Sequence, residues 1–399
     1  MDKTILLEKI KDTDSYMRHV RAYLHENPEL SSHEFETSRF LQAEVAKLGL
    51  PVTAVSQTGF YAVLDTGRPG RTIGLRADID ALPVPENPYN LIRKKQYVSK
   101  NEGVSHACGH DGHAAVLLGA AQVLHSLKEQ LSGTIIFIFE AAEETAGGID
   151  DMLAALSRFK IDAIYGSHLR ASLPTGEISI GDGAVMAGMA AIEFDVVGVG
   201  GHGSRPDLSV NPVFAAAQVL NGIAVAWSNQ LDVTKTVTLG ITQIHGGTVN
   251  NVFPNSVYIG GTLRFFDREA GEKAVEVFKK VAASITEAHN CSVVFRSRTG
   301  IVLEPVINDH TLADIARKAV EELYPDKLVA GEKWFGGEPF SKYRSIAPSV
   351  YAFIGIDNAA LGSGAEHHND RFDMDEDALP YSLGAMTGFA VKLLEQDYA

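Results

Sequence analysis

The chain has 399 residues, 45% of them hydrophobic and 21% charged, and its formal net charge is −15. This is the composition of a globular protein of about two or three domains, and the acidic balance argues against nucleic-acid or membrane partners, because phosphate binding depends on clustered cations. The two cysteines are too few for a secreted disulfide framework, and with an N-terminus that lacks a signal-peptide pattern they favour a reducing compartment, the cytoplasm.

The first part of the chain alternates helical and strand patterns. Residues 4–26 and 33–48 have helical apolar spacing, whereas the apolar run 134–141 is typical of a strand buried on both faces. This alternation predicts an α/β domain with a largely parallel sheet flanked by helices. The remaining elements are expected at strands 61–66, 72–79 and 163–169 and at helices after residue 113 and over 149–158.

The middle of the chain has a different order of elements: strand, helix, strand, strand, helix, strand. This order predicts a compact α+β unit of the ferredoxin-like type. After residue 300 the α/β pattern returns, with a helix over 309–323 and a strand over 349–356. We therefore expect one α/β domain, residues 1–186 and 301–399, interrupted by an inserted domain, residues 187–300.

The most informative segment is HACGHDGH (106–113), which contains one cysteine and three histidines. Cys108 and His110 are two residues apart, and thiolate and imidazole are preferred ligands of zinc and neighbouring transition metals. His106 and His113 lie beside them, and two glycines permit tight turns. A polar loop or a redox thiol is the simpler alternative, but the whole string favours a metal site.

Three glutamates, Glu140, Glu143 and Glu144, directly follow the buried strand. Ligands of open α/β sheets bind beyond the carboxyl ends of the strands, so these carboxylates lie where a site is expected. Adjacent residues of an extended chain point to opposite sides, which predicts that one of Glu143 and Glu144 faces a metal and the other the substrate. An acidic pair that only solvates a loop is the less favoured alternative after such an apolar strand.

Histidines follow the next strands of the predicted sheet. His168 comes at the end of the strand 163–169. A lone histidine there is more often a core residue than a ligand, but the sheet edge that it shares with the glutamates makes the two readings about equal. His367 and His368 lie in a glycine-rich loop after the strand 349–356. Cysteine, histidine and glutamate side chains thus gather at one edge of one sheet, a set that suits one or two divalent transition-metal ions.

With these motifs assembled, the chain resembles the aminoacylase/carboxypeptidase-G superfamily of metallopeptidases, and within it the amidohydrolase subfamily of hippurate and indole-acetyl-amino-acid hydrolases. The resemblance runs nearly from end to end. It implies a zinc-peptidase-like fold, in which a mixed, largely parallel sheet carries an inserted lid and dimerisation domain. The strings that carry it include RADIDALP (76–83), HACGHDGH (106–113), EAAEE (140–144), GGHGSRP (200–206), NNVFPNS (250–256) and HHNDRF (367–372).

The resemblance also implies a ligand set for one or two metal ions, which can be Zn, Mn, Co or Ni. Of the two adjacent histidines, His368 is preferred to His367, since it takes the family's place before a small polar residue and a phenylalanine. The matching ligands are Cys108 as a bridge between two ions, His110 and His168 on one ion, and Glu144 and His368 on the other.

Further residues match positions that act in the family's reaction. Glu143 matches the general base, and Asp78 matches an aspartate that contacts the metal ligands without being one of them. His202, Asn251 and Arg264 in the inserted domain match substrate-binding positions, and the predicted strand pair lets Asn251 and Arg264 face one ligand. In the family the histidine that His202 matches can reach a neighbouring subunit's site, which implies a homodimer or higher homo-oligomer.

These assignments predict a metal-dependent amidohydrolase that cleaves N-acyl amino acids. A metal-bound water loses its proton near neutral pH, and Glu143 delivers that proton to the leaving amine. His202 helps to stabilise the oxyanion. Arg264 holds the substrate carboxylate. A dipeptidase or carboxypeptidase with the same chemistry is the alternative, and a base beside the ligands disfavours a metal-binding protein without turnover. Pro339 stands where the family often has an aspartate, so the acyl group and the amino acid stay open.

Overall fold

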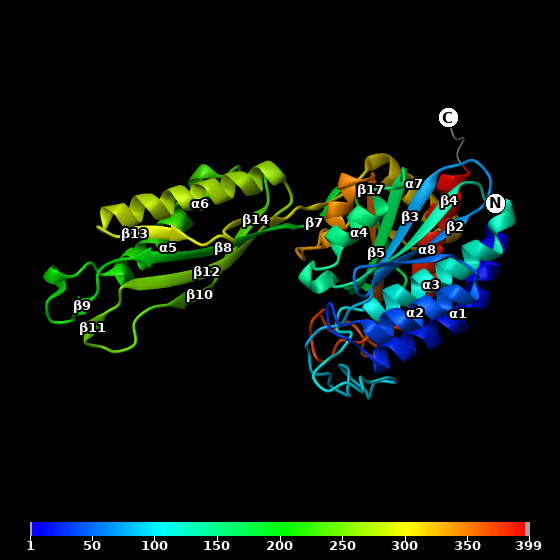
Figure 1. Cartoon of the computed structure of the whole chain (residues 1–399), viewed down its shortest axis with the longest axis horizontal. Helices are drawn as coiled ribbons and strands as arrows, with labels where there is room; N and C mark the ends of the chain where they lie inside the picture. Colours follow the sequence, from blue (N-terminus) through cyan, green and yellow to red (C-terminus); the bar gives the residue numbers. More distant parts are fainter. Residues whose placement is uncertain (1, 396–399) are drawn as a thin grey trace. The chain divides into compact units, whose positions relative to one another are not determined.

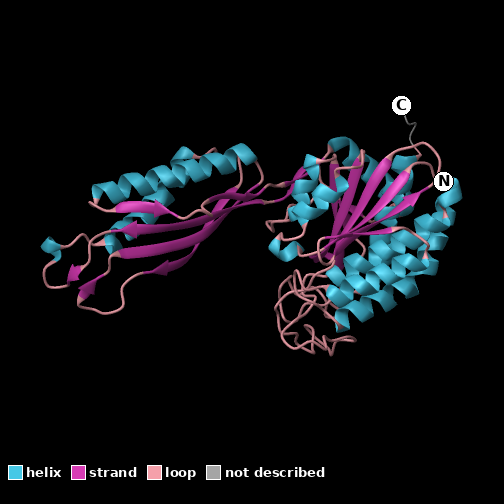
Figure 2. Cartoon of the chain, viewed as in Figure 1, coloured by secondary structure: helices cyan, strands magenta, loops and turns pink. Residues whose placement is uncertain are grey.

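The computed structural model describes residues 2–395 and divides into two compact units, each with its own hydrophobic core. The first unit comprises the residues up to Gly183, Ile307–Glu332 and the residues from Lys342 onward, and the second comprises Ala184–Val306 and Lys333–Ser341. Figure 1 follows the chain by residue number, and Figure 2 separates helices from strands. Two short strands lie where the chain leaves and re-enters the first unit, β7 (Gly183–Met186) and β15 (Val306–Asn308).

The first unit is built on an eight-stranded sheet with the order β1-β2-β4-β3-β5-β17-β6-β16. The central strands β4, β3, β5 and β17 are parallel, whereas the pairs β1-β2, β2-β4 and β17-β6 are antiparallel. The mixed, largely parallel sheet that the sequence predicts is therefore confirmed. Its strands are β1 (Val52–Val55), β2 (Gly59–Asp65), β3 (Thr72–Asp78), β4 (Thr134–Glu140), β5 (Ala163–Pro174), β6 (Ile178–Ser179), β16 (Leu328–Val329) and β17 (Ser349–Asp357).

Helices cover this sheet because its central strands are apolar on both faces. In β4, Ile135 and Phe137 belong to the core formed with α1, α3 and α8, while the buried Ile136 and Ile138 alternate to the other face. Among the described residues, no helix combines the length and apolar character needed to cross a bilayer. The helices are α1 (Lys3–Glu26), α2 (Phe35–Lys47), α3 (His110–Ser126), α4 (Ile149–Leu156), α7 (His310–Leu323) and α8 (Leu379–Leu394).

The carboxyl ends of the parallel strands bring the candidate residues to one edge of the sheet. Asp78 ends β3 and lies opposite Glu140, which ends β4. The pairing of β3 with β5 ends at Gly166, but β5 runs on beside β17, where His168 lies opposite Phe353. His168 is therefore inside a longer strand than the sequence predicts, yet it still lies past the last residue that β3 pairs.

The second unit is an antiparallel sheet with two helices that pack on each other and against it. The order β10-β12-β8-β13, with β14 also on β8, is the arrangement that strand, helix, strand, strand, helix, strand gives in a ferredoxin-like fold. This confirms that part of the sequence prediction. The elements are β8 (Gly188–Val197), β9 (Gly201–His202), α5 (Pro212–Gln230), β10 (Val237–His245), β11 (Val252–Phe253), β12 (Ser256–Phe265), α6 (Arg268–Ala288), β13 (Ser292–Phe295) and β14 (Gly300–Leu303).

Candidate metal centre

The segment HACGHDGH passes from a loop into α3 at Gly109, which has a φ of 86°. Glycine adopts this left-handed conformation without steric cost, so the chain turns sharply between Cys108 and His110. Both side chains are buried. The Cys108 Sγ, a ring nitrogen of His110 and a carboxylate oxygen of Glu144 all lie within 4.8 Å of one another, so three types of ligand converge here.

His168 and His368 lie beside this group. The His168 Nε2 is 3.5 Å from the Cys108 Sγ, and its Nδ1 is 2.6 Å from the Leu169 carbonyl oxygen. A ring that donates from Nδ1 to a carbonyl presents Nε2 as its ligand atom. The His368 Nε2 is 3.3 Å from the Glu144 Oε1. The five residues that the resemblance implies as ligands thus form one cluster in the structure, the metal cluster.

Two other buried histidines, His113 and His367, belong to groups of possible ligands near this cluster. Their Nε2 atoms, however, accept backbone hydrogen bonds. His113 Nε2 accepts the Leu169 N–H at 3.0 Å, and His367 Nε2 accepts the Ala171 N–H at 3.3 Å. A lone pair used in this way is not available to a metal ion. His367 nevertheless belongs to a group of possible ligands with Cys108 and His168, whereas the His368 Nε2 faces Glu144.

Glu143 and Glu144 lie in a short 3₁₀ helix, η2 (Glu143–Thr145), and not in an extended segment. The argument from alternating sides is therefore wrong, because consecutive residues of a 3₁₀ turn are about 120° apart. Both carboxylates approach the His110 Nε2, Glu144 Oε1 at 3.7 Å and Glu143 Oε2 at 3.9 Å. Glu144 also faces His368, so it is the carboxylate that lies between two histidines.

Asp80 joins two parts of the metal cluster, and the sequence reasoning missed it. Its Oδ1 is 3.1 Å from the His110 Nδ1, and its Oδ2 accepts the Glu144 N–H at 3.1 Å. Asp78 Oδ1 is 2.6 Å from the His113 Nδ1 and 3.7 Å from the His110 Nδ1. The available signal was position: Asp80 follows Asp78 by two residues and so points to the same side of an extended chain.

A buried ion pair explains why Glu140 is not part of the metal cluster. Arg76 Nε and Nη2 donate to the two Glu140 carboxylate oxygens, each at 3.0 Å, and its Nη1 donates to Asp78 Oδ2 at 2.8 Å. The Tyr343 hydroxyl donates to Glu140 Oε2 at 2.6 Å. The guanidinium balances the Glu140 charge with paired hydrogen bonds, so this glutamate secures the sheet edge.

The surroundings favour the protonated forms of two candidate ligands. Burial, with the charge of Glu144, raises the pKa of the Cys108 thiol well above its usual value. Burial acts to lower the pKa of His110, but Asp78 and Asp80 outweigh it and raise that pKa to about 10. The His110 Nε2 has no hydrogen-bond partner among the described residues. This buried nitrogen beside a thiol and a carboxylate fits a divalent transition metal, whose binding displaces such protons.

We expect Cys108 to react with a thiol reagent when metal is removed and to be protected when metal is bound, because a coordinated thiolate is not free to attack. Thiol titration before and after chelation measures this. The variant Cys291→Ser removes the second cysteine, which lies in the other unit, so that one thiol is counted. Equal reactivity of Cys108 in both states would exclude it as a ligand.

A buried charge cluster lies behind the first turn of α3. His25 Nδ1 is 2.8 Å from Asp111 Oδ2, and its Nε2 is 2.9 Å from Glu86 Oε1. Arg21 also contacts Asp111, and Lys95 also contacts Glu86. Burial and the Arg21 charge act to lower the pKa of His25, but its hydrogen bonds to two carboxylates outweigh them and raise it. Both ring nitrogens donate only when the ring is protonated.

We expect His25 to stabilise the fold most at mildly acidic pH. Its folded pKa is raised above the unfolded value of about 6.5, so its contribution is complete below that pH and is lost as pH rises through the folded pKa. Unfolding of the wild type and of His25→Gln, compared from about pH 6 to about pH 9, should show a shrinking difference. A difference that stays constant, or that grows with pH, would contradict a protonated His25.

In the second unit, His202 and Asn251 lie side by side. β9 pairs with β11, and the Gly203 N–H donates to the Asn251 carbonyl at 2.8 Å. Arg264 lies opposite Met189 at the far end of β12, a strand of ten residues. At about 3.4 Å per residue, the length of the sheet separates Arg264 from the other two. The expectation that Asn251 and Arg264 of one chain face the same ligand is therefore wrong.

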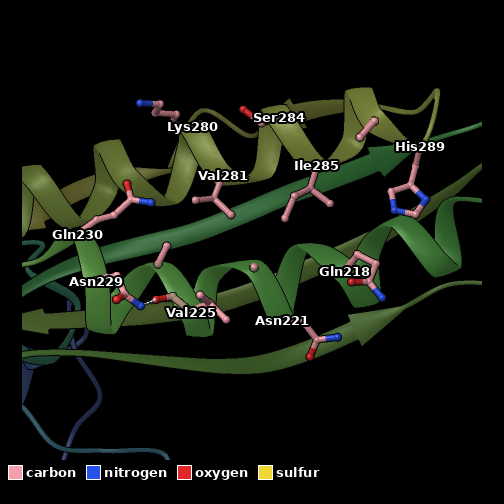
Figure 3. Close-up of a pocket in the computed structure, with 13 residues that line it drawn as sticks. Gln218, Asn221, Val225, Asn229, Gln230, Lys280, Val281, Ser284, Ile285 and His289 are labelled. Atoms are coloured by element: carbon pink, nitrogen blue, oxygen red, sulfur yellow. Dashed lines mark hydrogen bonds between the residues drawn. The ribbon is translucent and has the colours of Figure 1, made fainter.

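The second unit also has a groove of about 700 Å³ between α5 and α6 (Figure 3). Its walls combine amide side chains, such as Gln218 and Asn221, with aliphatic ones, such as Val225 and Ile285. Neither a carboxylate nor a cysteine lines it, and His289 is its one imidazole. The groove therefore lacks the combination of ligands that a metal centre would need.

Comparison with known proteins places these features in a family context. The chain matches the sequence profile of peptidase family M20/M25/M40 over residues 74–392. It is 34% identical over 387 residues to thermostable carboxypeptidase 2 of Saccharolobus solfataricus, covering 96% of this chain and 95% of that protein. With the N-acyl-L-amino acid amidohydrolase of Geobacillus stearothermophilus it shares 36% identity over 306 residues, covering 76% and 80%. The crystal structure of the Bacillus subtilis YXEP protein, a dinuclear metal binding peptidase from the M20 family, matches with a TM-score of 0.84 at 30% identity, covering 97% and 100%.

Proposed function

The chain belongs to peptidase family M20/M25/M40, and on this premise we propose that it hydrolyses the amide bond of N-acyl amino acids. One of its relatives is named as an N-acyl-L-amino acid amidohydrolase, and another as a carboxypeptidase. The observation that carries the proposal is the η2 turn, which places two carboxylates, Glu143 and Glu144, beside the same histidine. One suffices as a ligand, which leaves the other to act as a base.

In this proposal the metal cluster holds one or two divalent ions, Zn, Mn, Co or Ni. When bound, such ions lower the pKa of a coordinated water to about 7 and polarise the substrate carbonyl. His368 is taken as the ligand in preference to His367 because it faces Glu144. The residues that would hold these ions are Cys108, His110, Glu144, His168 and His368.

Glu143 is the proposed general base. It takes the proton of the attacking water and delivers it to the amine nitrogen as the amide bond breaks. Asp80 hydrogen-bonds both the His110 ring and the Glu144 N–H. It therefore holds these two ligands, and the adjacent base Glu143, in fixed positions relative to one another. Asp78 contributes less directly, by orienting His113 and neutralising part of the Arg76 charge.

Residues 187–300 are proposed to act as a lid and a dimer surface. Arg264 reads the substrate carboxylate, Asn251 binds the substrate, and His202 polarises its carbonyl oxygen. Because the length of β12 separates Arg264 from the β9-β11 pair, where His202 and Asn251 lie, one substrate can meet all three only if two copies contribute. This supports a homodimer or a higher homo-oligomer, and the low cysteine content supports a cytoplasmic location.

We expect His202→Ala and Arg264→Ala, each slow on an N-acyl amino acid when alone, to hydrolyse it faster when the two proteins are mixed under conditions that exchange subunits. In the mixed dimer, one site receives neither change if His202 and Arg264 come from different chains. The measurement is the hydrolysis rate of the mixture against that of each variant alone. A mixture no faster than its components, with exchange verified by a tagged subunit, would place both residues in one chain's site.

The reaction itself is tested with a panel of N-acyl amino acids and dipeptides after metal loading. We expect the N-acyl amino acids to have the higher kcat/KM. Faster cleavage of dipeptides or longer peptides would instead support the carboxypeptidase reading that the thermostable relative suggests. Full metal content without hydrolysis of any panel member would leave a metal-binding protein as the better description.

A further inference from the structure

The turn that carries Glu143 and Glu144 is bounded by two alanines in an uncommon conformation. Ala142 has φ 53° and ψ 44°, and Ala146 has φ 53° and ψ 27°, both left-handed. Residues with a Cβ avoid this region, so surrounding contacts must hold them there. Such backbone strain is often found where a side chain must be aimed.

A buried glutamate on another segment makes the contact that holds Ala142. Glu34 has an exposed fraction of 0%, and its Oε1 accepts the Ala142 N–H at 2.8 Å. The same oxygen accepts the N–H of Ser32 at 2.9 Å, and Ser32 is itself left-handed, with φ 66°. The Thr58 hydroxyl donates to the other oxygen at 2.8 Å. One carboxylate therefore joins two left-handed residues from separate parts of the chain.

The rest of the turn is fixed independently of Glu34. The Gly147 N–H donates to the Ala142 carbonyl at 2.9 Å, and the Ala146 N–H donates to the Glu143 carbonyl at 2.8 Å. At Gly148, a Cβ would lie 2.0 Å from the Ala141 carbonyl oxygen, so only glycine fits. The entry to the turn at Ala142 is thus the point that depends on a distant side chain.

Glu34 itself has no ion-pair partner among the described residues, and no candidate metal ligand is among its hydrogen-bond partners. Neither a charge pair nor a metal explains a carboxylate buried here. Its three donors are instead the groups that shape the approach to η2. We propose that Glu34 is a positioning residue, whose hydrogen bond to the Ala142 N–H holds the turn that aims Glu143. This inference rests on the proposed function, in which Glu143 is the base.

The test compares two changes at Glu34. Glu34→Ala removes both acceptors and should lower kcat by about 100-fold, the usual effect of misplacing a reacting group by about 1 Å. KM and metal content should change little. Glu34→Gln keeps an oxygen for both N–H groups and should retain most of the activity. The matched control is Glu36→Gln, an exposed glutamate on α2 that forms an ion pair with Arg39.

A rescue experiment separates positioning from general support of the fold. Glycine adopts the left-handed conformation without strain, so Ala142→Gly should restore part of the kcat lost in Glu34→Ala. If Glu34→Ala does not fold, Thr58→Val keeps the shape of the side chain but removes one donor, and it should lower kcat with metal content intact.

Wild-type kcat in Glu34→Ala, loss of its metal, or no rescue by Ala142→Gly would each overturn the inference, as would wild-type kcat in Thr58→Val. These outcomes differ from a failure of the proposed function, which Glu143→Gln tests. If Glu143→Gln were active, Glu143 would not be the general base, and the proposed function would fail at that point. An inactive Glu143→Gln together with a fully active Glu34→Ala would leave the base in place and reject only the role of Glu34.

Discussion

Glu143→Gln should keep its metal and lose nearly all turnover, with kcat falling about 100- to 10,000-fold, the range typical of a missing general base. The amide has the shape of the carboxylate but cannot take a proton from water. Glu143 Oε2 is 3.9 Å from the His110 Nε2, close enough to the metal cluster to reach a water held there. Metal content by emission spectroscopy and steady-state rates decide the matter together.

The neighbouring glutamate provides the contrast. Glu144 lies between His110 and His368, so Glu144→Gln should weaken metal binding, whereas Glu143→Gln should not. Metal titrations of the two variants would separate the role of ligand from the role of base. The sequence cannot assign these roles, because the two residues are adjacent and of the same type. Near-normal turnover in Glu143→Gln would mean that another group is the base.

The sequence predicted the long elements of the fold better than the short ones. The apolar run of β4 and the element order of the second unit have strong patterns, because several residues in succession meet a core. The strands β6 (Ile178–Ser179) and β16 (Leu328–Val329) have two residues each, too few for any period to appear. They exist because β17 and the chain around it bring their backbones together.

The candidate site divides in the same way. Ligand types and their sheet edge follow from the sequence, but the choice among neighbouring histidines does not. His113 is excluded by a backbone N–H of Leu169, a residue 56 positions away in the chain. Asp80 and Glu34 were not predicted because each accepts a backbone N–H at the η2 turn, that of Glu144 and that of Ala142. A hydrogen bond to backbone leaves no trace in the identity of the residue that donates it.

Arg264→Ala should remove the preference of the enzyme for a free substrate carboxylate. The simplest alternative role for an arginine is a surface salt bridge, which contributes little. Arg264 has no carboxylate partner among the described residues. Its Nε donates to the Phe335 carbonyl at 3.1 Å, and its Nη1 contacts the Thr262 hydroxyl and the Leu263 carbonyl. A half-buried cation held by neutral oxygens keeps its charge available to an anion from outside the chain.

The measurement is kcat/KM for one N-acyl amino acid and for its carboxamide, in the wild type and in the variant. A planar guanidinium binds a carboxylate with two parallel hydrogen bonds, so Arg264→Ala should penalise the acid by about 2–5 kcal/mol, as expected when one partner of a buried charge pair is truncated. The carboxamide should be affected far less. Arg296 in the same unit is the matched control, because it already pairs with Asp195, and Arg296→Ala should slow neither substrate. Equal slowing of acid and carboxamide by Arg264→Ala would show that this arginine supports the lid rather than reads the substrate.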